Sequence, residues 1–91
     1  LAADLGKPAF EAFAADLGFP IGEAAMALKH LDRWMKPQKV AQPAVQRPGR
    51  SWVQYDPLGV ILIIAPWNYP VQLCFNPLVA AIAAGNCAVI K

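Results

Sequence analysis

The chain has 91 residues, of which 57% are hydrophobic and only 15% are charged, and its formal net charge is +2. An apolar content above the usual ~45–50% excludes an intrinsically disordered protein, and the small net charge gives no indication of an acidic partner. A domain of this size cannot readily hide so much apolar surface by itself. We therefore expect the chain to be an internal piece of a longer protein, against which part of this surface packs.

The first residues are expected to form two short helical segments. Leu1–Leu5 followed by Gly6 has the pattern of a last helical turn with a glycine C-cap. Pro8 fits the first position of a second helix, because its missing N–H is not needed there. Apolar residues follow at helical spacing, and Gly18 is expected to end this second helix.

A longer helix is expected from Pro20 to Lys36, where Pro37 cannot continue the hydrogen-bond ladder. Its apolar residues alternate in steps of three and four, which predicts one buried face. The residues of this face are Ile21, Ala24, Leu28, Leu31 and Met35.

Residues 37–50 are rich in Pro, Gln and Arg, and short strands are expected at about 39–42 and 51–55. This pattern is typical of an extended arm or hairpin rather than of a core. Six of the eight basic residues fall on or beside the stretch: Lys29, Arg33, Lys36, Lys39, Arg47 and Arg50. A nucleic-acid surface is conceivable, but a solvated helix face and linker explain the same pattern, and we predict no nucleic-acid partner.

The last third of the chain predicts a β-α-β unit. Val60–Ile64 is an uninterrupted apolar run, expected to form a strand buried on both faces in a parallel sheet. Asn76-Pro77 has the pattern of an N-cap and a first-turn proline, and predicts a helix that Gly85 closes. Cys87–Lys91 is then a second strand, parallel to the first. We predict an α/β fold, the start of a doubly wound, Rossmann-like domain.

A membrane span is the alternative for Gly59–Ile90, which contains no charged residue. Each of Pro66, Pro70 and Pro77 would remove a backbone donor or clash inside a single spanning helix. We therefore predict no membrane span in this segment.

Ligands of open α/β sheets bind beyond the carboxyl ends of the strands. The loop Pro66–Pro70 and Lys91 meet that description, although no GxGxxG or GxxxxGK[ST] motif is present. Asn68 offers a neutral N–H donor suited to an oxyanion hole, where losing a donor costs roughly 3–4 kcal/mol of transition-state stabilisation. An asparagine that caps its own turn would have the same spacing.

These motifs resemble the aldehyde dehydrogenase superfamily. The pentapeptide Pro66-Trp-Asn-Tyr-Pro70 is preceded by Pro57-Leu-Gly-Val-Ile61 and followed by Ala81-Ile-Ala-Ala-Gly-Asn-Cys-Ala-Val-Ile-Lys91. Upstream, Ala3-Asp-Leu-Gly-Lys-Pro8 and Leu28-Lys-His-Leu-Asp-Arg-Trp-Met-Lys-Pro37 resemble its class 3 branch. The similarity extends over essentially the whole chain.

The resemblance implies an enzyme that oxidises an aldehyde to a carboxylic acid with NAD or NADP. In this family a cysteine thiolate attacks the carbonyl, hydride passes to the nicotinamide, and a glutamate-activated water hydrolyses the thioester. Asn68 matches the family's oxyanion-stabilising asparagine, and Lys91 matches the lysine that binds the adenosine ribose hydroxyls. The segment whose backbone lines the cofactor cleft is matched by Ile64, Ala65, Pro66 and Trp67.

The resemblance also divides the chain into leading helices of the cofactor-binding domain (1–38), an arm that joins a small oligomerisation sheet (39–56) and the first β-α-β unit (57–91). It implies a cytoplasmic homo-oligomer, a dimer when intact, and no metal. The family's catalytic cysteine and glutamates lie downstream, so the 91 residues alone are expected to be inactive. Cys74 and Cys87 are expected to be buried, reduced thiols; no His, Lys or Arg stands beside either one in the sequence, so neither is a candidate nucleophile.

Two alternatives stay open on the sequence. One is a non-catalytic relative kept as a binding or scaffold protein. The other is an acylating or phosphorylated-substrate dehydrogenase of the same fold, which the class 3-like leader disfavours. A downstream cysteine in a Gly-rich context with a glutamate before it would separate an aldehyde dehydrogenase from the first alternative.

Overall fold

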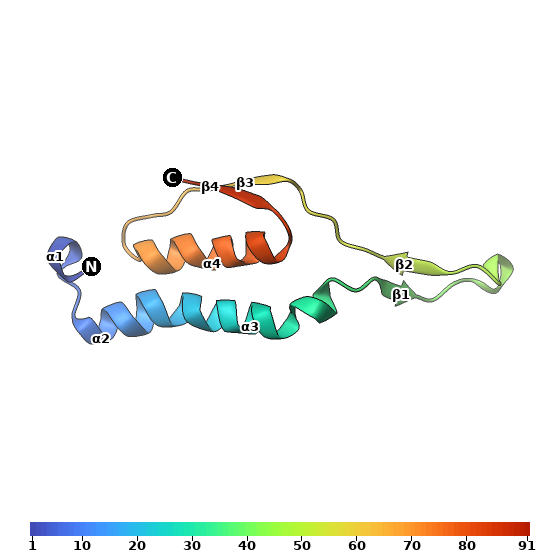
Figure 1. The fold of residues 1–91 in the computed structure, drawn as a ribbon, viewed down its shortest axis with the longest axis horizontal. Coiled ribbons are helices and arrows are strands. Elements are labelled where there is room, and N and C mark those ends of the chain that lie inside the picture. Colours follow the sequence, from blue (N-terminus) through green and yellow to red (C-terminus); the bar gives the residue numbers. More distant parts are fainter.

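The computed structural model describes residues 1–91 as a layered body with a projecting arm (Figure 1). The leading helices are α1 (Ala2–Leu5), α2 (Ala9–Glu11), the π-helical segment η1 (Ala12–Leu17) and the long helix α3 (Gly18–Trp34). The arm carries β1 (Gln38–Val40), a 3-10 turn, η2 (Ala44–Gln46), and β2 (Ser51–Val53). The last elements are β3 (Val60–Ile63), α4 (Pro70–Ala83) and β4 (Cys87–Ile90).

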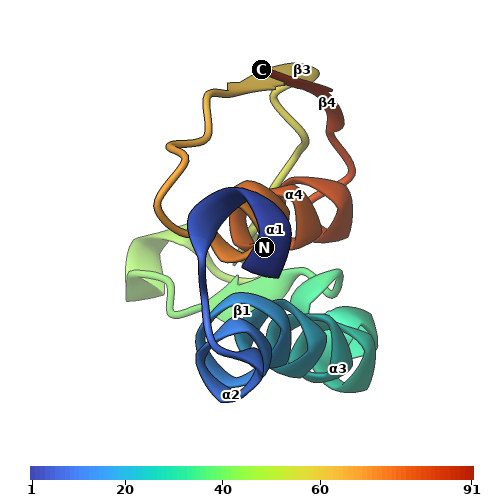
Figure 2. The ribbon, with the colours of Figure 1, turned by 90° about the vertical axis from the view of Figure 1, so that its left-hand side faces the viewer.

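Helix α4 forms the middle layer of the body. It packs against α3 on one side and against the β3–β4 pair on the other, as the end-on view shows (Figure 2). Strands β3 and β4 are parallel, in a register that runs from Val60 opposite Cys87 to Ile63 opposite Ile90. The predicted β-α-β unit with parallel strands is therefore confirmed.

The arm projects from the body as a two-stranded antiparallel ribbon. Strands β1 and β2 pair from Gln38 opposite Val53 to Val40 opposite Ser51. The radius of gyration is 18.8 Å, whereas a compact chain of this length would have about 12 Å. The extended arm predicted from the proline-rich segment is confirmed, and it accounts for this difference (Figure 1).

The predicted helix end at Gly18 is wrong. Gly18 has right-handed helical angles, φ −62° and ψ −41°, and the helical run continues into α3. Its N–H bonds the carbonyl of Phe13, five residues back, and a Cβ at Gly18 would lie 3.3 Å from that same oxygen. Glycine is used here for the close approach that the wider π-helical turn requires, not for a left-handed cap such as Gly6 provides at φ 64°.

The predicted buried face of the long helix is only partly right. Ala24 and Leu31 are half-buried, but Ile21, Leu28 and Met35 are 62%, 80% and 69% exposed. The face that packs towards α4 instead carries the buried Pro20 and the half-buried Glu23, Ala24, Ala27, His30 and Leu31. Small alanines allow two helix axes to approach closely. The face that packs against α4 is therefore the one with small side chains, not the one with the largest apolar side chains.

The predicted start of α4 at Asn76-Pro77 is also wrong. The helix begins at Pro70, with Pro77 in its interior, and the Asn76 Oδ1 atom is buried without a hydrogen-bond partner. Tyr69-Pro70 offers the same first-turn proline seven residues earlier. The capping acceptor there comes from a distant part of the chain, so no capping side chain beside Pro70 in the sequence marks the start.

Burial within these 91 residues is limited, and β3 is covered on one face only by other residues of the chain. The buried residues are Asp16, Pro20, Ile63 and Ala81, and of these Asp16 is fully buried. In β3, Ile61 is half-buried on the side of Ile63, whereas Val60 and Leu62 are exposed. Cys74 is half-buried and Cys87 is exposed, so the expected burial of both thiols is not found.

No helix combines the length and the apolar character that crossing a bilayer requires.

The predicted closure of α4 at Gly85 is confirmed and can be tested by substitution. Gly85 has φ 81°, and an added Cβ would meet only the Pro57 ring at 3.6 Å, an ordinary contact. We expect Gly85→Ala to reduce the free energy of unfolding by about 1–2 kcal/mol, the cost of a left-handed non-glycine residue. Chemical denaturation of the full-length protein measures this change.

The matched control is Gly22→Ala in α3, where an added Cβ meets nothing within 4 Å and φ is not positive. That variant should be stabilised by up to about 1 kcal/mol, because alanine is the better helix former. Equal stability changes of the same sign in the two variants would contradict the backbone explanation.

Candidate functional site

A hollow lies at the carboxyl end of the β3–β4 pair. It has a volume of about 290 Å³ and is lined by Ile64, Ala65, Pro66, Trp67 and Lys91. These are the five residues that the sequence singled out as the cofactor segment and the ribose-binding lysine. The structure thus brings the two predicted parts, far apart in the chain, to one place.

Backbone hydrogen bonds hold the two sides of the hollow together. The Lys91 N–H donates to the carbonyl of Ile63 at 2.9 Å, and the Ala65 N–H donates to the carbonyl of Lys91 at 3.0 Å. These bonds continue the parallel ladder beyond the last residues of both strands. The first residue of the loop and the terminal lysine are therefore fixed by main chain, and the exposed Lys91 side chain is free to reach a ligand.

Asn68 lies in the loop between Trp67 and Tyr69 and is exposed. Its side chain forms no hydrogen bond within the chain, so it does not cap its own turn. It is not among the residues that line the hollow. The structure therefore places Asn68 next to the hollow along the loop, with its amide N–H groups available to a ligand.

A buried carboxylate caps the helix that follows this loop. Asp16, on the π-helical segment η1, is 0% exposed. Its Oδ1 atom accepts the N–H groups of Val71 and Gln72 at 3.2 and 3.3 Å. These are donors of the first turn of α4, which have no partner inside the helix. A negative charge at this end also interacts favourably with the helix dipole.

Lys7 compensates the buried charge. Its Nζ atom lies 2.6 Å from the Asp16 Oδ2 atom and 3.6 Å from the centroid of the Tyr69 ring. A cation over an aromatic face is an attractive arrangement. Lys7 thus joins the loop after α1 to the η1 segment and to the residue that follows Asn68.

The ionisation of Asp16 reflects this environment. Desolvation by burial raises the pKa of Asp16, but the hydrogen bond and charge of Lys7 and the two N–H groups of α4 outweigh it. The net pKa is below the usual value of 3.8. The carboxylate is therefore charged at neutral pH, and its interactions favour that form.

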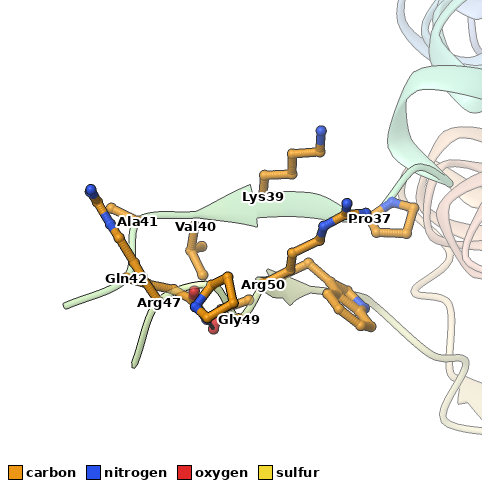
Figure 3. A pocket seen from close by; sticks show the side chains of 11 residues that line it. Pro37, Lys39, Val40, Ala41, Gln42, Arg47, Gly49 and Arg50 are labelled. Carbon is orange, nitrogen blue, oxygen red and sulfur yellow. Dashed lines mark hydrogen bonds between the residues drawn. The ribbon is translucent and has the colours of Figure 1, made fainter. Parts of the chain in front are cut away.

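A larger hollow lies elsewhere, on the arm. It measures about 870 Å³ and its walls come from the strands and the loop of the arm, away from the helices (Figure 3). Its charged side chains are basic, namely Lys39, Arg47 and Arg50, and none of the predicted site residues borders it. Size therefore does not identify the candidate site; the position at the strand ends does.

The two cysteines are poorly placed to act at the hollow. Cys87 pairs with Val60 at the opposite end of the strands from Lys91, and four residues of strand span about 13 Å. Cys74 is half-buried in α4. No group of three His, Cys, Asp or Glu side chains gathers to hold a metal ion.

Sequence reasoning missed Asp16, Lys7 and Tyr69. Asp16 is separated by 55 residues from its partner Val71, so its role depends on the tertiary packing of η1 against the start of α4. The available signals were weak: an acidic residue inside an otherwise apolar helical stretch, and a helix start that lacks its own capping side chain.

The lowered pKa predicts how acid affects stability. Asp16 stabilises the fold above pH 3.8, and this contribution is lost as the pH falls through its lower folded-state pKa. We expect Asp16→Asn to destabilise the full-length protein most at neutral pH. Urea denaturation from about pH 7 to about pH 3 should show the two unfolding free energies converging on the acid side. Asp32→Asn, at an exposed position, is the control, and a difference that is constant with pH would contradict the assignment.

Comparisons with known proteins agree with this geometry. A model of the aldehyde dehydrogenase family matches residues 1–91. Aldehyde dehydrogenase family 3 member B1 of Mus musculus is 45% identical over 91 residues, which are 100% of this chain and 19% of that protein. The 4,4'-diaponeurosporen-aldehyde dehydrogenase of Staphylococcus aureus is 47% identical over 88 residues, 97% of this chain and 19% of that protein.

A solved structure described as the substrate-bound state of Staphylococcus aureus AldH matches with a TM-score of 0.97 and 46% identity, covering 100% of this chain and 20% of that one. The chain thus spans about a fifth of the length of these relatives. The predicted class 3-like resemblance and the α/β fold are confirmed. The family match over every residue and the closely superposing structure show that this chain belongs to the aldehyde dehydrogenase family.

Proposed function

We propose that these residues form the first β-α-β unit of the cofactor-binding domain of an NAD(P)-dependent aldehyde dehydrogenase, preceded by its leading helices (1–38) and an oligomerisation arm (39–56). The observation that carries the proposal is the hollow at the carboxyl end of the β3–β4 pair. In open α/β sheets this is where nucleotides bind. The names of the relatives add the substrate class, an aldehyde.

The hollow fits one portion of a dinucleotide. Sites for drug-sized ligands usually measure about 300–1,000 Å³, so a hollow of about 290 Å³ is suited to part of NAD(P). Lys91 is the residue that would donate to ribose hydroxyls, and the backbone of Ile64–Trp67 would form one wall. When bound, NAD(P) supplies the hydride acceptor.

Asn68 would stabilise the developing oxyanion of the substrate. Its amide donates N–H hydrogen bonds without titrating, and no internal hydrogen bond competes for them. Such a fixed neutral donor favours the tetrahedral alkoxide over the planar carbonyl. The nucleophilic cysteine and the glutamate that activates water would come from outside these residues, because Cys74 and Cys87 are unsuited.

The intact enzyme would act as a cytoplasmic homo-oligomer, a dimer. The support is the arm, a two-stranded ribbon that extends from the body with Trp52 and Val53 exposed. An antiparallel ribbon with unpaired outer edges is well suited to join the sheet of a second copy.

Substitution of Asn68 tests the catalytic role. In the full-length enzyme, Asn68→Ala should lower kcat about 10²–10³-fold while KM for the cofactor stays similar, since only transition-state contacts are lost. Steady-state NAD(P)H formation measures both constants. Gln54→Ala, at another exposed amide on the arm, is the control and should leave kcat unchanged. A normal kcat for Asn68→Ala removes Asn68 from the mechanism.

Substitution of Lys91 tests the cofactor site. Lys91→Met keeps the backbone bonds to Ile63 and Ala65 but removes the charged donor. A hydrogen bond from a charged group contributes about 1.5–3 kcal/mol, so we expect the Kd for NAD(P) to rise about 10–100-fold. Isothermal titration measures it, with Lys36→Met as the control at an exposed lysine. An unchanged Kd would show that the side chain does not contact the cofactor.

A further inference from the structure

We propose that Asp16 and Lys7 are positioning residues for Asn68: together they fix the far end of the loop that carries its amide. This inference rests on the proposed oxyanion role of Asn68. Neither residue touches the hollow, and their contacts lie at the end of the loop, with Tyr69 and the first turn of α4.

The loop is anchored at both ends and free in the middle. At its start, the Ala65 N–H is bonded to the Lys91 carbonyl. At its end, the first N–H groups of α4 are bonded to Asp16, and Tyr69 lies beneath the Lys7 ammonium. Only Pro66, Trp67 and Asn68 lie between these anchors, and all three are exposed.

The contacts of Asp16 and Lys7 at the end of the loop therefore limit the position of Asn68. Trp67 is 84% exposed, so side-chain packing within the chain does not hold the loop from inside. Pro66 restricts the first of the three residues through its fixed φ. The remaining freedom of Asn68 is limited by where Tyr69 and the start of α4 are held.

Asp16 is suited to hold the start of α4 in place because both of its carboxylate oxygens accept hydrogen bonds. Oδ1 accepts two N–H groups from α4 and Oδ2 pairs with Lys7. At 0% exposure, water cannot take over these bonds when one partner is lost. The network therefore has to rearrange, and the parts able to move are the loop and the first turn of α4.

Lys7 connects the carboxylate to the neighbour of Asn68. One ammonium group serves both contacts, at 2.6 Å to Asp16 and 3.6 Å to the Tyr69 ring. Lys7→Arg keeps a cation that can pair with the carboxylate and lie over the aromatic ring. A neutral side chain of similar length, Lys7→Met, loses both.

The test is a double-mutant cycle in the full-length enzyme. Asp16→Asn keeps an oxygen for the α4 N–H groups but ends the ion pair with Lys7, so it disturbs the position of the loop while an acceptor for the first turn of α4 remains. We expect kcat for aldehyde oxidation to fall about 10–100-fold, as small displacements of catalytic groups do. KM values should change little, and Lys7→Met should match this loss while Lys7→Arg restores the rate. Asp32→Asn, exposed on α3, is the matched control.

The decisive comparison is with Asn68→Ala. If Asp16 acts through Asn68, adding Asp16→Asn to Asn68→Ala lowers kcat no further. If the two losses multiply, or if Asp16→Asn lowers the melting temperature but leaves kcat unchanged, the positioning role is overturned and the oxyanion role of Asn68 stands. If Asn68→Ala alone has normal kcat, the oxyanion role fails and the inference fails with it. Should Asp16→Asn not fold, the same cycle is run with Lys7→Met.

Discussion

The buried carboxylate of Asp16 is the interaction on which the arrangement of this chain depends. A charge removed from water is costly unless it is paired and hydrogen-bonded, and Asp16 has a cation on one oxygen and two N–H donors on the other. Its partners come from the loop after α1 and from the start of α4. One side chain thereby joins the loop after α1 and the η1 segment to the start of α4, which lies 55 residues further along the chain, and α3 is continuous with η1.

The position of the candidate site follows from that junction. Helix α4 is held against α3 on one side and spans the β3–β4 pair on the other, so fixing its N-terminus also fixes the end of the β3–α4 loop (Figure 2). The strand ladder fixes the beginning of the same loop at Ala65 and Lys91. The loop segment Pro66–Asn68 thus lies between a main-chain ladder at its start and a side-chain network at its end, and the hollow is at the ladder end.

Features with local causes could be predicted from the sequence, and features with distant causes could not. The strands at Val60–Ile63 and Cys87–Ile90 and the glycine at 85 follow from short apolar runs and a single residue's backbone freedom. The strand-end rule, which needs only topology, points to the loop Pro66–Pro70 and to Lys91, whereas Ile64 and Ala65 are implied only by the resemblance to the family. The start of α4 was misplaced at Asn76-Pro77 because the acceptor that caps Val71 and Gln72 lies 55 and 56 residues away. The buried face of α3 differs from the predicted one because its packing against α4 depends on small alanines rather than on the large apolar residues.

A charged network suits this position better than an apolar one, although it need not be the more stable choice. Replacing a buried ion pair by packed apolar residues is often neutral or stabilising. Apolar contacts, however, are non-directional, whereas hydrogen bonds to Asp16 specify the direction of two N–H groups as well as their distance. A catalytic donor has to be held within about 0.5 Å of its productive position. Directional anchors on both sides of the three-residue loop would meet that demand for Asn68, the proposed donor, whose own side chain is unbonded within the chain and exposed.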